Sequence, residues 1–377
     1  MSIKPQFRIL LIGGYGIFGS RIAERLAKVS SYHLIIAGRT ADRAEQLVGH
    51  IKSSNAKAEI SVIECDIRSP ASLQYALNVS QCQLVINASG PYQDADFLHV
   101  RQIIQSGIHY IDMADSRRYV CNFSKLDSLA KQYGVLAITG ASSVPALSSA
   151  IADNIAKNYL SVSHIDIGIS PGNKTPRGSA TVRSILSYCG RPFLIWHDRI
   201  WKPTRGWQGL TRRQYPSPMG KRWLSDCDVP DLTLFQSRYA KVKSVRFRAG
   251  LELGILHIGT WILSYFVQFK ILSDLARYSE KLKIISEWLI SFGTQTGGMH
   301  VELEGIDKDN NTNRTVWYLI ADRGDGPQVP CTAAVILAKK FSQGTLSQTG
   351  AIPCLGLISK SEFDREFSRY HISQVVI

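Results

Sequence analysis

The sequence predicts an α/β fold, a doubly wound parallel sheet with an inserted second α/β domain of mixed sheet and helices. Three observations support this prediction. Short apolar segments alternate with amphipathic segments over residues 7–150, as expected for a parallel sheet covered by helices. A glycine-rich turn joins the first apolar segment to the first amphipathic one. The chain has 377 residues, which is enough for two domains.

Six apolar runs are expected to be the strands of the first domain. Ser69 followed by Pro70 is typical of a helix N-terminus, and Gly107 and Gly134 stand where helices should end. In a doubly wound sheet, ligands bind beyond the carboxyl ends of the strands, so the residues that follow the strands are the candidates for a site. The strands are expected at residues 7–12, 33–37, 60–65, 84–87, 110–112 and 135–139.

The turn after the first strand lies in the segment LIGGYGIFGSRIA, residues 11–23. It has the spacing Gly14-x-Gly16-x-x-Gly19 between a strand and a helix, which is typical of a Rossmann dinucleotide-binding turn. The first glycine permits the tight turn, the second lets a pyrophosphate approach the backbone, and the third lets helix and strand pack closely. The alternative is an ordinary glycine-rich turn. The predicted cofactor contacts are Gly14, Tyr15, Gly16, Ile17, Phe18 and Gly19.

The end of the second strand predicts which dinucleotide binds. The segment IIAGRTADRAEQL lacks the acidic residue that would accept hydrogen bonds from a free ribose 2′-hydroxyl, and Arg39 and Thr40 follow the strand instead. An arginine there can bind the 2′-phosphate of NADP through charge-assisted hydrogen bonds, with help from Thr40 and Arg43. The alternative is that Arg39 merely begins a solvated helix. We therefore expect NADP as the cofactor.

Residues after the third and fourth strands complete the expected cofactor site. Asp66 either accepts a hydrogen bond from the adenine amino group or caps the turn before Pro70. The small residues after the fourth strand would let a nicotinamide ribose lie against the backbone, which would bring Tyr92 near the hydride. The predicted contacts in this part of the chain are Asp66, Ile67, Ala88, Ser89, Gly90 and Tyr92.

The segments GGYGIFG, AGR, VINASGPY, GIHYIDMADS and GASSVPALSS occur in this order between residues 7 and 149. On these motifs the chain resembles the saccharopine dehydrogenase-like NADP-binding oxidoreductases, and residues 170–325 resemble a bacterial branch of that family. The resemblance implies a Rossmann domain at 1–150, an inserted substrate and dimerisation domain at 151–325, and a C-terminal return to the Rossmann domain at 326–377. It also implies reduction of a carbonyl, imine or enoyl group of a small or lipid-like substrate.

Hydride transfer to such a group needs a proton donor or an oriented dipole that meets the developing negative charge. The principal candidates are Tyr92 and Asp115, and Arg177 and His300 are further candidates. Each candidate has a structural alternative. Tyr92 could only pack on the nicotinamide, Asp115 could pair with a neighbouring arginine, and His300 alternates within a predicted strand. The spacing of the sequence does not choose among them.

Composition adds expectations about location and metals. The seven cysteines form no CxxC pair and no metal-ligand spacing, so we expect reduced thiols in a cytoplasmic protein and no metal site. The N-terminal segment MSIKPQFRIL has no apolar stretch typical of a signal peptide.

The net charge of +14 is concentrated in one part of the chain. Residues 170–248 hold sixteen Lys and Arg against four Asp, which is 16 − 4 = +12. Tryptophans and a tyrosine are interleaved with these charges, yet no nucleic-acid-binding motif accompanies them, so we expect no nucleic acid partner. Two interpretations stay open: a solvated basic surface around the cofactor site, or a surface that rests on an anionic membrane.

The segment LGILHIGTWILSYFVQF, residues 253–269, is uncharged and is expected to be a helix. Its polar residues His257, Thr260, Ser264 and Gln268 form one narrow stripe beside a broad apolar face. Its seventeen residues are short of the roughly 20 that span a bilayer. The apolar face should therefore pack in a core or homodimer interface, or lie peripherally on an anionic membrane. The latter leaves a second function class open, a non-catalytic NADP-binding scaffold at a membrane surface.

Overall fold

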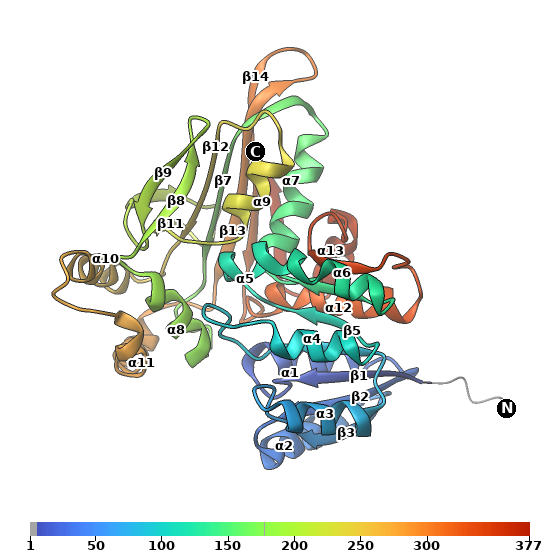
Figure 1. The fold of residues 1–377 in the computed structure, drawn as a ribbon. Helices are drawn as coiled ribbons and strands as arrows, with labels where there is room; N and C mark the ends of the chain where they lie inside the picture. The colour runs from blue at the N-terminus through green and yellow to red at the C-terminus, as the bar shows by residue number, and fades with distance from the viewer. Residues whose placement is uncertain (1–5, 177) are drawn as a thin grey trace. The chain divides into compact units, whose positions relative to one another are not determined.

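The computed structural model describes residues 6–176 and 178–377, which form two compact units (Figure 1). Unit 1 contains the chain up to Asp115 together with Tyr119–Ala146 and Pro330–Ile358. Unit 2 contains Ser116–Arg118, Leu147–Val329 and Ser359–Ile377. The chain therefore leaves unit 1, builds most of unit 2, and comes back to unit 1 for a short segment.

Unit 1 is built on a seven-stranded sheet whose neighbouring strands all run parallel, in the order β15-β6-β5-β4-β1-β2-β3. The six strands predicted from the apolar runs are confirmed, with ends shifted by at most one residue. Neighbours β1 and β4 are not consecutive in the chain, which makes the gap beyond their carboxyl ends the switch point where doubly wound folds bind ligands. The strands are β1 Phe7–Ile12, β2 Tyr32–Gly38, β3 Glu59–Glu64, β4 Leu84–Asn87, β5 His109–Asp112, β6 Leu136–Thr139 and β15 Gly350–Pro353.

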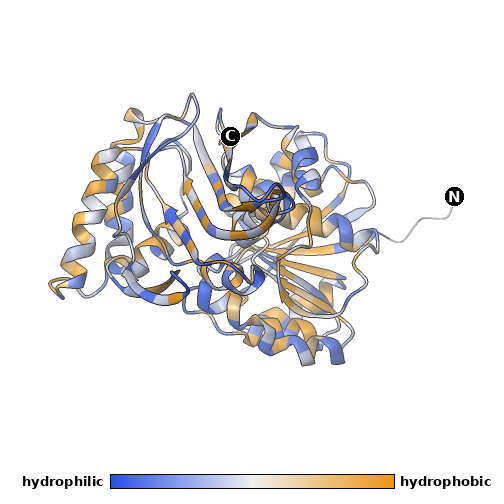
Figure 2. Cartoon of the chain, turned by 90° about the horizontal axis from the view of Figure 1, so that it is seen from above, coloured by the Kyte–Doolittle hydropathy of each residue, from blue (hydrophilic) through white to orange (hydrophobic). Residues whose placement is uncertain are grey.

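The central strands of unit 1 are buried over their whole length, as the continuous apolar runs predict. Figure 2 shows these strands as an almost uniformly hydrophobic group. The predicted helix start is also confirmed, since the Ser69 hydroxyl accepts from the Ser72 N–H and Pro70 stands in the first turn. The helices are α1 Ile17–Leu26, α2 Ala41–Ser53, α3 Pro70–Ser80, α4 Leu98–Gln105, α5 Arg117–Asn122, α6 Asp127–Gln132 and α12 Gln328–Ser342, of which α5 and α12 cross the border between the units.

Unit 2 is built on a mixed sheet with the main strand order β10-β11-β12-β7-β13-β14-β16. The predicted strand pair near residues 297–321 is confirmed as an antiparallel hairpin, whereas β12 and β7 run parallel. The strands are β7 Tyr159–Ser170, β8 Pro192–His197, β9 Ile200–Arg205, β10 Thr211–Gln214, β11 Lys221–Asp226, β12 Ser244–Ala249, β13 Gly297–Asp307, β14 Thr312–Ala321 and β16 Ile372–Val376.

The two faces of this sheet differ in polarity. Residues of β7 alternate, so that Ile165 and Ile167 belong to one face and Asp166 to the other. The register pairs Asp166 with Glu302 on β13, which continues the polar face on the next strand. Helices α7 Ser148–Ala156 and α9 Asp231–Arg238 pack on strands of this sheet. The remaining helices of unit 2 are α8 Ser179–Tyr188, α10 Gly254–Gln268, α11 Ser279–Trp288 and α13 Lys360–Phe367.

The end of the chain departs from the expected domain organisation. Only Pro330–Ile358 lies in unit 1, where β15 extends the parallel sheet beside β6. Residues 359–377, which were expected in the first domain, lie in unit 2 because β16 pairs antiparallel with β14 at the edge of the mixed sheet. Of the segment 326–377 that was expected to return to the Rossmann domain, residues 326–329 and 359–377 therefore lie in unit 2.

Helix α10 confirms the helix predicted at residues 253–269, but its polar stripe faces inward. His257 and Ser264 are fully buried, whereas Ile255 is 72% exposed and Phe269, at the helix end, is 67% exposed. Both nitrogens of the buried imidazole have partners, the Ser225 hydroxyl and the Leu251 N–H. In the part of the chain that the structure describes, no helix is both long and apolar enough to cross a membrane.

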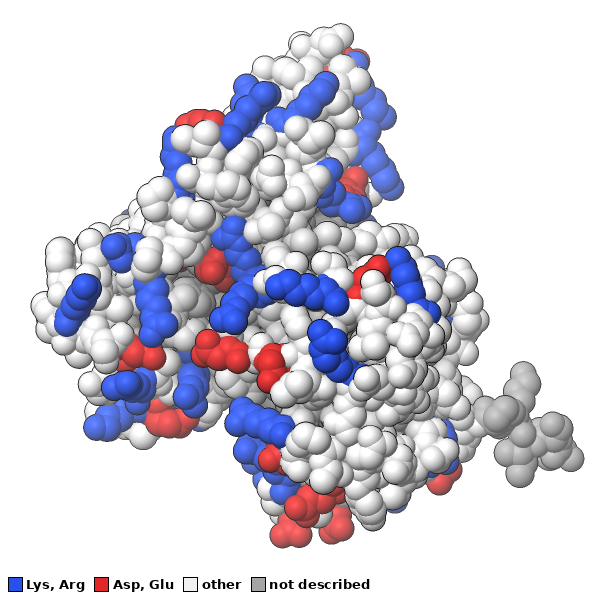
Figure 3. Space-filling model, viewed as in Figure 1, with Lys and Arg blue, Asp and Glu red and all other residues white. Residues whose placement is uncertain are grey.

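The basic residues of 170–248 are less free than a purely solvated surface would require. Among those that the structure describes, seven form ion pairs with carboxylates inside unit 2. Figure 3 shows Lys and Arg interspersed with Asp and Glu over the face that it presents, without one continuous basic patch. The seven are Arg191, Lys202, Arg213, Arg222, Arg238, Arg246 and Arg248.

Candidate functional site

The glycine-rich turn of unit 1 is packed so closely that side chains would not fit. A Cβ atom on Gly19 would lie 2.1 Å from the carbonyl oxygen of Gly13, so helix α1 can approach the turn only with glycine at this position. A Cβ on Gly14 would lie 2.8 Å from the Ile36 side chain on β2. These distances give the physical reason for two of the three predicted glycines.

The start of α1 is open to an anion. Gly16 is the N-cap residue and provides no side-chain cap, and the first turn contains no acidic residue. The first backbone N–H groups of the helix and its dipole are therefore available to a phosphate group. A Cβ on Gly13 would lie 3.0 Å from the backbone of Ala88 and Ser89, so this turn lies directly against the predicted contact residues after β4.

Tyr15 connects the glycine-rich turn to the end of β2. A Cβ on Gly38 would lie 2.3 Å from the Tyr15 ring, so the ring packs on bare backbone at this position. The Tyr15 hydroxyl accepts a hydrogen bond from the Thr40 N–H at 3.2 Å, and the Arg43 guanidinium carbon lies 4.9 Å from the ring centroid. Arg39 and Arg43 are both exposed. Two guanidinium groups are thus placed at the strand end where a 2′-phosphate was expected.

Asp66 takes part in the turn that leads into α3. Its carboxylate accepts from the Arg68 N–H at 3.0 Å, and its own N–H donates to the Ser72 hydroxyl at 3.0 Å. The structure therefore shows the turn role that was weighed for Asp66, and contact with adenine stays a prediction for Asp66 and Ile67.

Asn87 organises the residues that follow β4. Its side-chain oxygen accepts from the N–H and hydroxyl of Ser89, and its amide donates to the Tyr110 hydroxyl at 3.1 Å. Tyr92 is buried, and its hydroxyl donates to the Asn87 carbonyl oxygen at 2.8 Å. Burial raises the pKa of Tyr92 well above its ordinary value. This arrangement fixes the strand end and commits the Tyr92 proton to the backbone.

Asp112 at the end of β5 is a fully buried carboxyl that the sequence analysis did not single out. One oxygen, Oδ1, accepts from the N–H groups of Ala114 and Gly140 and from the Thr139 hydroxyl. Burial raises the pKa of Asp112 to about 6, and these hydrogen bonds oppose the rise. The register places Asp112 beside Asn87, at the same edge of the sheet as the predicted cofactor contacts.

The remaining catalytic candidates have different surroundings. Asp115 accepts from the Gln93 side-chain amide at 3.1 Å, whereas Arg117, one of its expected neighbours, pairs with Asp228. Arg177 lies outside the described residues. His300 is fully buried within β13 of unit 2. Within 6–176 and 178–377, no group of three or more His, Cys, Asp and Glu side chains is arranged to hold a metal ion.

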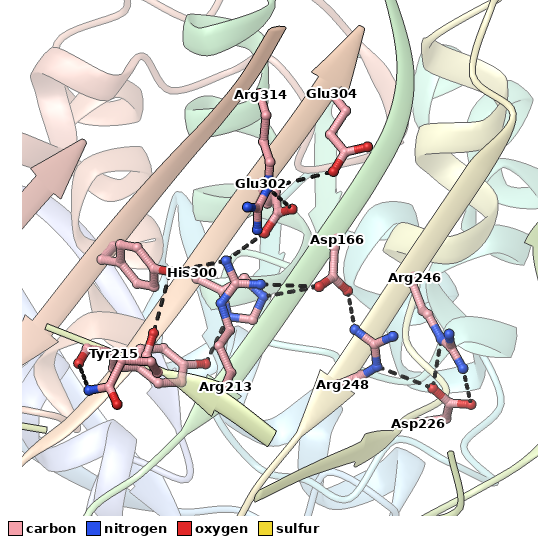
Figure 4. Close-up of polar contacts among 12 residues, drawn as sticks. Asp166, Arg213, Tyr215, Asp226, Arg246, Arg248, His300, Glu302, Glu304 and Arg314 are labelled. Carbon is pink, nitrogen blue, oxygen red and sulfur yellow. Dashed lines mark hydrogen bonds and ion pairs between the residues drawn. The ribbon is translucent and has the colours of Figure 1, made fainter. Parts of the chain in front are cut away.

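Unit 2 contains a network of ionic side chains on the polar face of its sheet (Figure 4). Asp166 on β7 lies at its centre, 2.7 Å from Nη1 of Arg248 and 3.3 Å from Nη1 of Arg213. The imidazole of His300 lies 3.5 Å from the same carboxylate. Burial alone would raise the pKa of Asp166, but His300 and the two guanidinium groups lower it below its ordinary value.

Glu302 forms the second centre of this network. It accepts from Arg213 and from Arg314, each at 2.5 Å, and Arg213 also donates to the Tyr318 hydroxyl at 3.1 Å. Hydrogen bonds from the two arginines lower the pKa of Glu302 against the effect of burial. The carboxylates of the network are therefore charged at neutral pH and held by fixed cations.

His300 joins the network to a buried tyrosine. The Tyr215 hydroxyl and Nδ1 of His300 are 2.7 Å apart, and burial lowers the pKa of the imidazole. The neutral ring then accepts from Tyr215 at Nδ1 and carries its proton on Nε2, toward Asp166. His300 lies on the same face of the sheet as Asp166, and because His300 and Tyr215 are fully buried, the imidazole has no access to a ligand in solution.

The sequence alone did not predict that four charged residues of unit 2 form one network. These residues are Asp166, Arg213, Arg248 and Glu302. The available signal was the alternation of charged and apolar residues in HIDIG and HVELEG, which indicates a charged sheet face. It does not reveal the partners, because Arg213 and Glu302 are 89 residues apart in the chain.

Comparisons with known proteins agree with this description. Residues 9–138 match the family model described as the saccharopine dehydrogenase NADP binding domain. No curated protein matches the chain. Among solved structures, saccharopine dehydrogenase (L-Glu forming) from Saccharomyces cerevisiae is similar with a TM-score of 0.67 at 12% identity, over 98% of this chain and 99% of that one.

Two further solved structures are less similar. A dehydrogenase from Chromobacterium violaceum has a TM-score of 0.40 at 9% identity, over 85% of this chain and 76% of that one. GenD2 from gentamicin A biosynthesis, in complex with NAD, has a TM-score of 0.38 at 12% identity, over 83% of this chain and 73% of that one. Scores this low carry no argument about this chain. Residues 9–138 are thus similar to the saccharopine dehydrogenase NADP binding domain, and the whole chain has a fold similar to that of the yeast enzyme.

Proposed function

We propose that the protein is an NADP(H)-dependent oxidoreductase that reduces a carbonyl, imine or enoyl group of a small or lipid-like substrate. The observation that carries this proposal is the NADP binding domain, whose glycine-rich turn is packed against the residues after β4. Binding the cofactor there would place its nicotinamide end near the carboxyl ends of β4 and β5. NADPH would supply the hydride, and the protein would hold it, orient it and exclude water.

Each predicted contact has a proposed role in holding NADP. Residues 14–19 would bind the pyrophosphate through backbone N–H groups, and Arg39, Thr40 and Arg43 would bind the 2′-phosphate. Asp66 and Ile67 would line the adenine. Ala88, Ser89 and Gly90 would leave room for the nicotinamide ribose because their side chains are small or absent.

The two catalytic candidates differ in what they can offer. Tyr92 would support the nicotinamide, because its proton already bonds to the Asn87 carbonyl. Asp115 is half-buried and shares a hydrogen bond with Gln93. We expect Tyr92→Phe to change cofactor affinity more than the maximal rate, and Asp115→Asn to lower the maximal rate if Asp115 positions the proton donor.

Cofactor turnover tests the proposed function. Purified protein is mixed with NADPH and a panel of aldehydes, ketones, imines and enoyl thioesters, and oxidation is followed at the absorbance of the reduced nicotinamide. The proposal requires oxidation with at least one class of acceptor and faster oxidation of NADPH than of NADH. Tight NADPH binding without oxidation by any class would favour the non-catalytic scaffold instead.

Helix α10, whose polar stripe is buried and whose apolar residues are exposed, supports a second candidate function, attachment to an anionic membrane surface. Its outward residues include Ile262 and Phe266, and α11 adds Ile285 and Trp288, all exposed. Lys270 lies two residues after the end of α10, and such a mixture of apolar and basic residues suits the headgroup region of a bilayer. Attachment would suit a lipid-like substrate.

Flotation with liposomes tests this second candidate. The protein should float with vesicles that contain anionic phosphatidylserine, less so at high salt, and less when Ile262 and Phe266 are both replaced by serine. Analytical ultracentrifugation of the same variant tests the alternative, that the exposed face of α10 forms a homodimer interface. Such a homodimer should dissociate when the two residues are replaced by serine. A protein that never floats and dissociates on substitution would show a dimer interface.

A further inference from the structure

A pocket of about 330 Å³ lies on the polar face of the unit 2 sheet. Its wall contains four arginines, Arg212, Arg213, Arg248 and Arg314, and one carboxylate, Asp166. Arg213 and Arg314 also pair with the nearby Glu302, so the four guanidinium groups are balanced only in part and an excess of positive charge stays at the wall. Guanidinium groups are also planar donors that match carboxylate and phosphate oxygens in pairs.

One of these arginines keeps an unused hydrogen-bond donor. Nε of Arg213 is buried and has no hydrogen-bond acceptor among the described residues, whereas Nε of Arg248 lies 3.7 Å from Oδ1 of Asp226. A buried charged donor without a partner costs free energy, and an oxyanion in the pocket would remove that cost if it reached Nε of Arg213. The pattern is expected of a site whose ligand completes the hydrogen bonding.

The arginines of the wall differ in their exposure to solvent. The side chains of Arg213 and Arg248 are only 13% and 14% exposed and are held by Asp166. Arg314 is 57% exposed, and the Arg212 guanidinium lies 5.3 Å from the centroid of the Trp223 ring. Two cations are thus preorganised at the base, and two more exposed cations, of which Arg314 is also bound to Glu302, lie at the rim.

The single carboxylate does not make the pocket a cation site. Asp166 is already shared between Arg213, Arg248 and His300, so its charge is compensated within the wall. A cation would meet four guanidinium groups before it met an available carboxylate oxygen. An anion, by contrast, is attracted by the guanidinium groups that line the wall.

We propose that this pocket is a binding site for a small anion that carries carboxylate or phosphate groups. The site lies wholly within unit 2 and does not rest on the proposed function, since binding can be measured without turnover. The volume suits an anion of the size of a short dicarboxylate or inorganic phosphate.

Isothermal titration of the full chain tests the site, with succinate in one arm and inorganic phosphate in the other. The protein is first saturated with NADPH, so that the phosphate-binding part of unit 1 is occupied. If NADPH does not bind, the same titrations are run without it. Sodium chloride at equal ionic strength controls for general screening. Tighter binding of succinate would identify a carboxylate site, and tighter binding of phosphate would identify a phosphate site.

Arg212→Gln and Arg314→Gln are the diagnostic variants, because both side chains are at the rim and leave Asp166 and its two buried arginines intact. Each should weaken binding of the preferred probe by about 10-fold, the scale of one lost charge-assisted hydrogen bond. Lys241→Gln, an exposed residue outside the pocket wall, is the matched control and should bind as the wild type does.

Thermal unfolding of each variant checks that it folds as the wild type does. Wild-type protein that binds neither probe would overturn the proposal. So would wild-type affinity in both rim variants, because the wall arginines would then play no part. Equal weakening by Lys241→Gln would also overturn it, because binding would then reflect the overall charge. Loss in both rim variants alone, with NADPH affinity unchanged, is the result that the proposal predicts.

Discussion

The sheets of the two units shift the pKa of a carboxyl group in opposite directions. In the parallel sheet of unit 1, Asp112 is fully buried and bonds to two backbone N–H groups and a hydroxyl, and burial raises its pKa to about 6. In the mixed sheet of unit 2, Asp166 lies between two arginines and a histidine that lower its pKa. One carboxyl is accommodated by hydrogen bonds to neutral groups, and the other belongs to an ionic network.

This difference shows how each sheet obtains its stability and its chemistry. Unit 1 depends on apolar strands and close backbone packing, so its site is formed by turns with small residues. Unit 2 leaves one face of its sheet charged, so its candidate pocket is formed by side chains from several strands. Loss of packing should therefore harm unit 1 most, and loss of charge should harm unit 2 most.

The largest effect is expected from Gly19→Val. The new side chain would meet the Gly13 carbonyl and the Gly14 backbone, which cannot move without opening the turn. We expect loss of NADPH binding and a fall in the free energy of unfolding of roughly 3 kcal/mol or more. Denaturant titration and cofactor fluorescence measure the two effects.

Gly49→Ala is the control, since a Cβ there has no neighbour within 4 Å in helix α2. It should leave binding unchanged and stabilise the helix slightly. Normal NADPH binding by Gly19→Val would contradict the packing account of unit 1.

Asp166→Asn should have the second largest effect, because it leaves Arg213 and Arg248 without their shared charge. We expect a loss of about 2 kcal/mol at pH 7, less than for a fully buried pair because Asp166 is 25% exposed. The pKa of Asp166 is lowered in the folded state, so its stabilising contribution is present above the ordinary Asp pKa and is lost as the pH falls through the folded-state pKa.

The difference between Asp166→Asn and the wild type should therefore shrink on acidification, in chemical denaturation followed from pH 7 downward. Asp309→Asn, on the exposed hairpin, is the control and should match the wild type throughout. A difference that does not depend on pH would show that the charge of Asp166 contributes nothing.

Asp112→Asn should have a smaller effect of the opposite sign. The folded-state pKa of Asp112 is about 6, above its ordinary value of 3.8, so the folded protein binds the proton more tightly than the unfolded chain does. The free energy of unfolding of the wild type should then fall as the pH rises from about 4 to about 6. Asparagine stays neutral, so the variant should be more stable than the wild type at pH 8, by about 2 kcal/mol, and similar to it at pH 4.

Unfolding curves of Asp112→Asn at the two pH values measure this prediction. A variant that is less stable at pH 8 would show that the charged carboxylate is stabilised by a partner, and the contrast between the two sheets would then fail.

The same contrast explains what the sequence could predict. Strands of unit 1 are buried on both faces and follow one another in the sheet almost in chain order, so apolar runs and the Gly14 to Gly19 spacing were sufficient. The ionic network of unit 2 depends on pairs such as Arg213 and Glu302, which only the folded sheet brings together. The pairing of β16 with β14, which places the end of the chain in unit 2, also joins residues that are distant in the sequence and could not be predicted from it.

Helix α10 shows a different limit of sequence reasoning. Its periodicity correctly predicted a helix with a narrow polar stripe. Periodicity cannot tell which side faces the protein, and here His257 and Ser264 are buried against unit 2. The hydrogen bonds of the His257 imidazole with Ser225 and Leu251 hold the polar stripe of α10 toward the interior of unit 2.

Cofactor titration with wild type and Arg39→Ala tests the central claim, that unit 1 binds NADP through the cations after β2. Binding of NADPH and NADH is followed by cofactor fluorescence at constant ionic strength. We expect the wild type to bind NADPH more tightly than NADH. Arg39→Ala should weaken NADPH binding by about 10-fold and change NADH binding little. This is the lower end of the range for loss of a charged hydrogen bond, because Arg39 is exposed. Equal weakening for both cofactors, or a wild type that binds them equally well, would contradict the account.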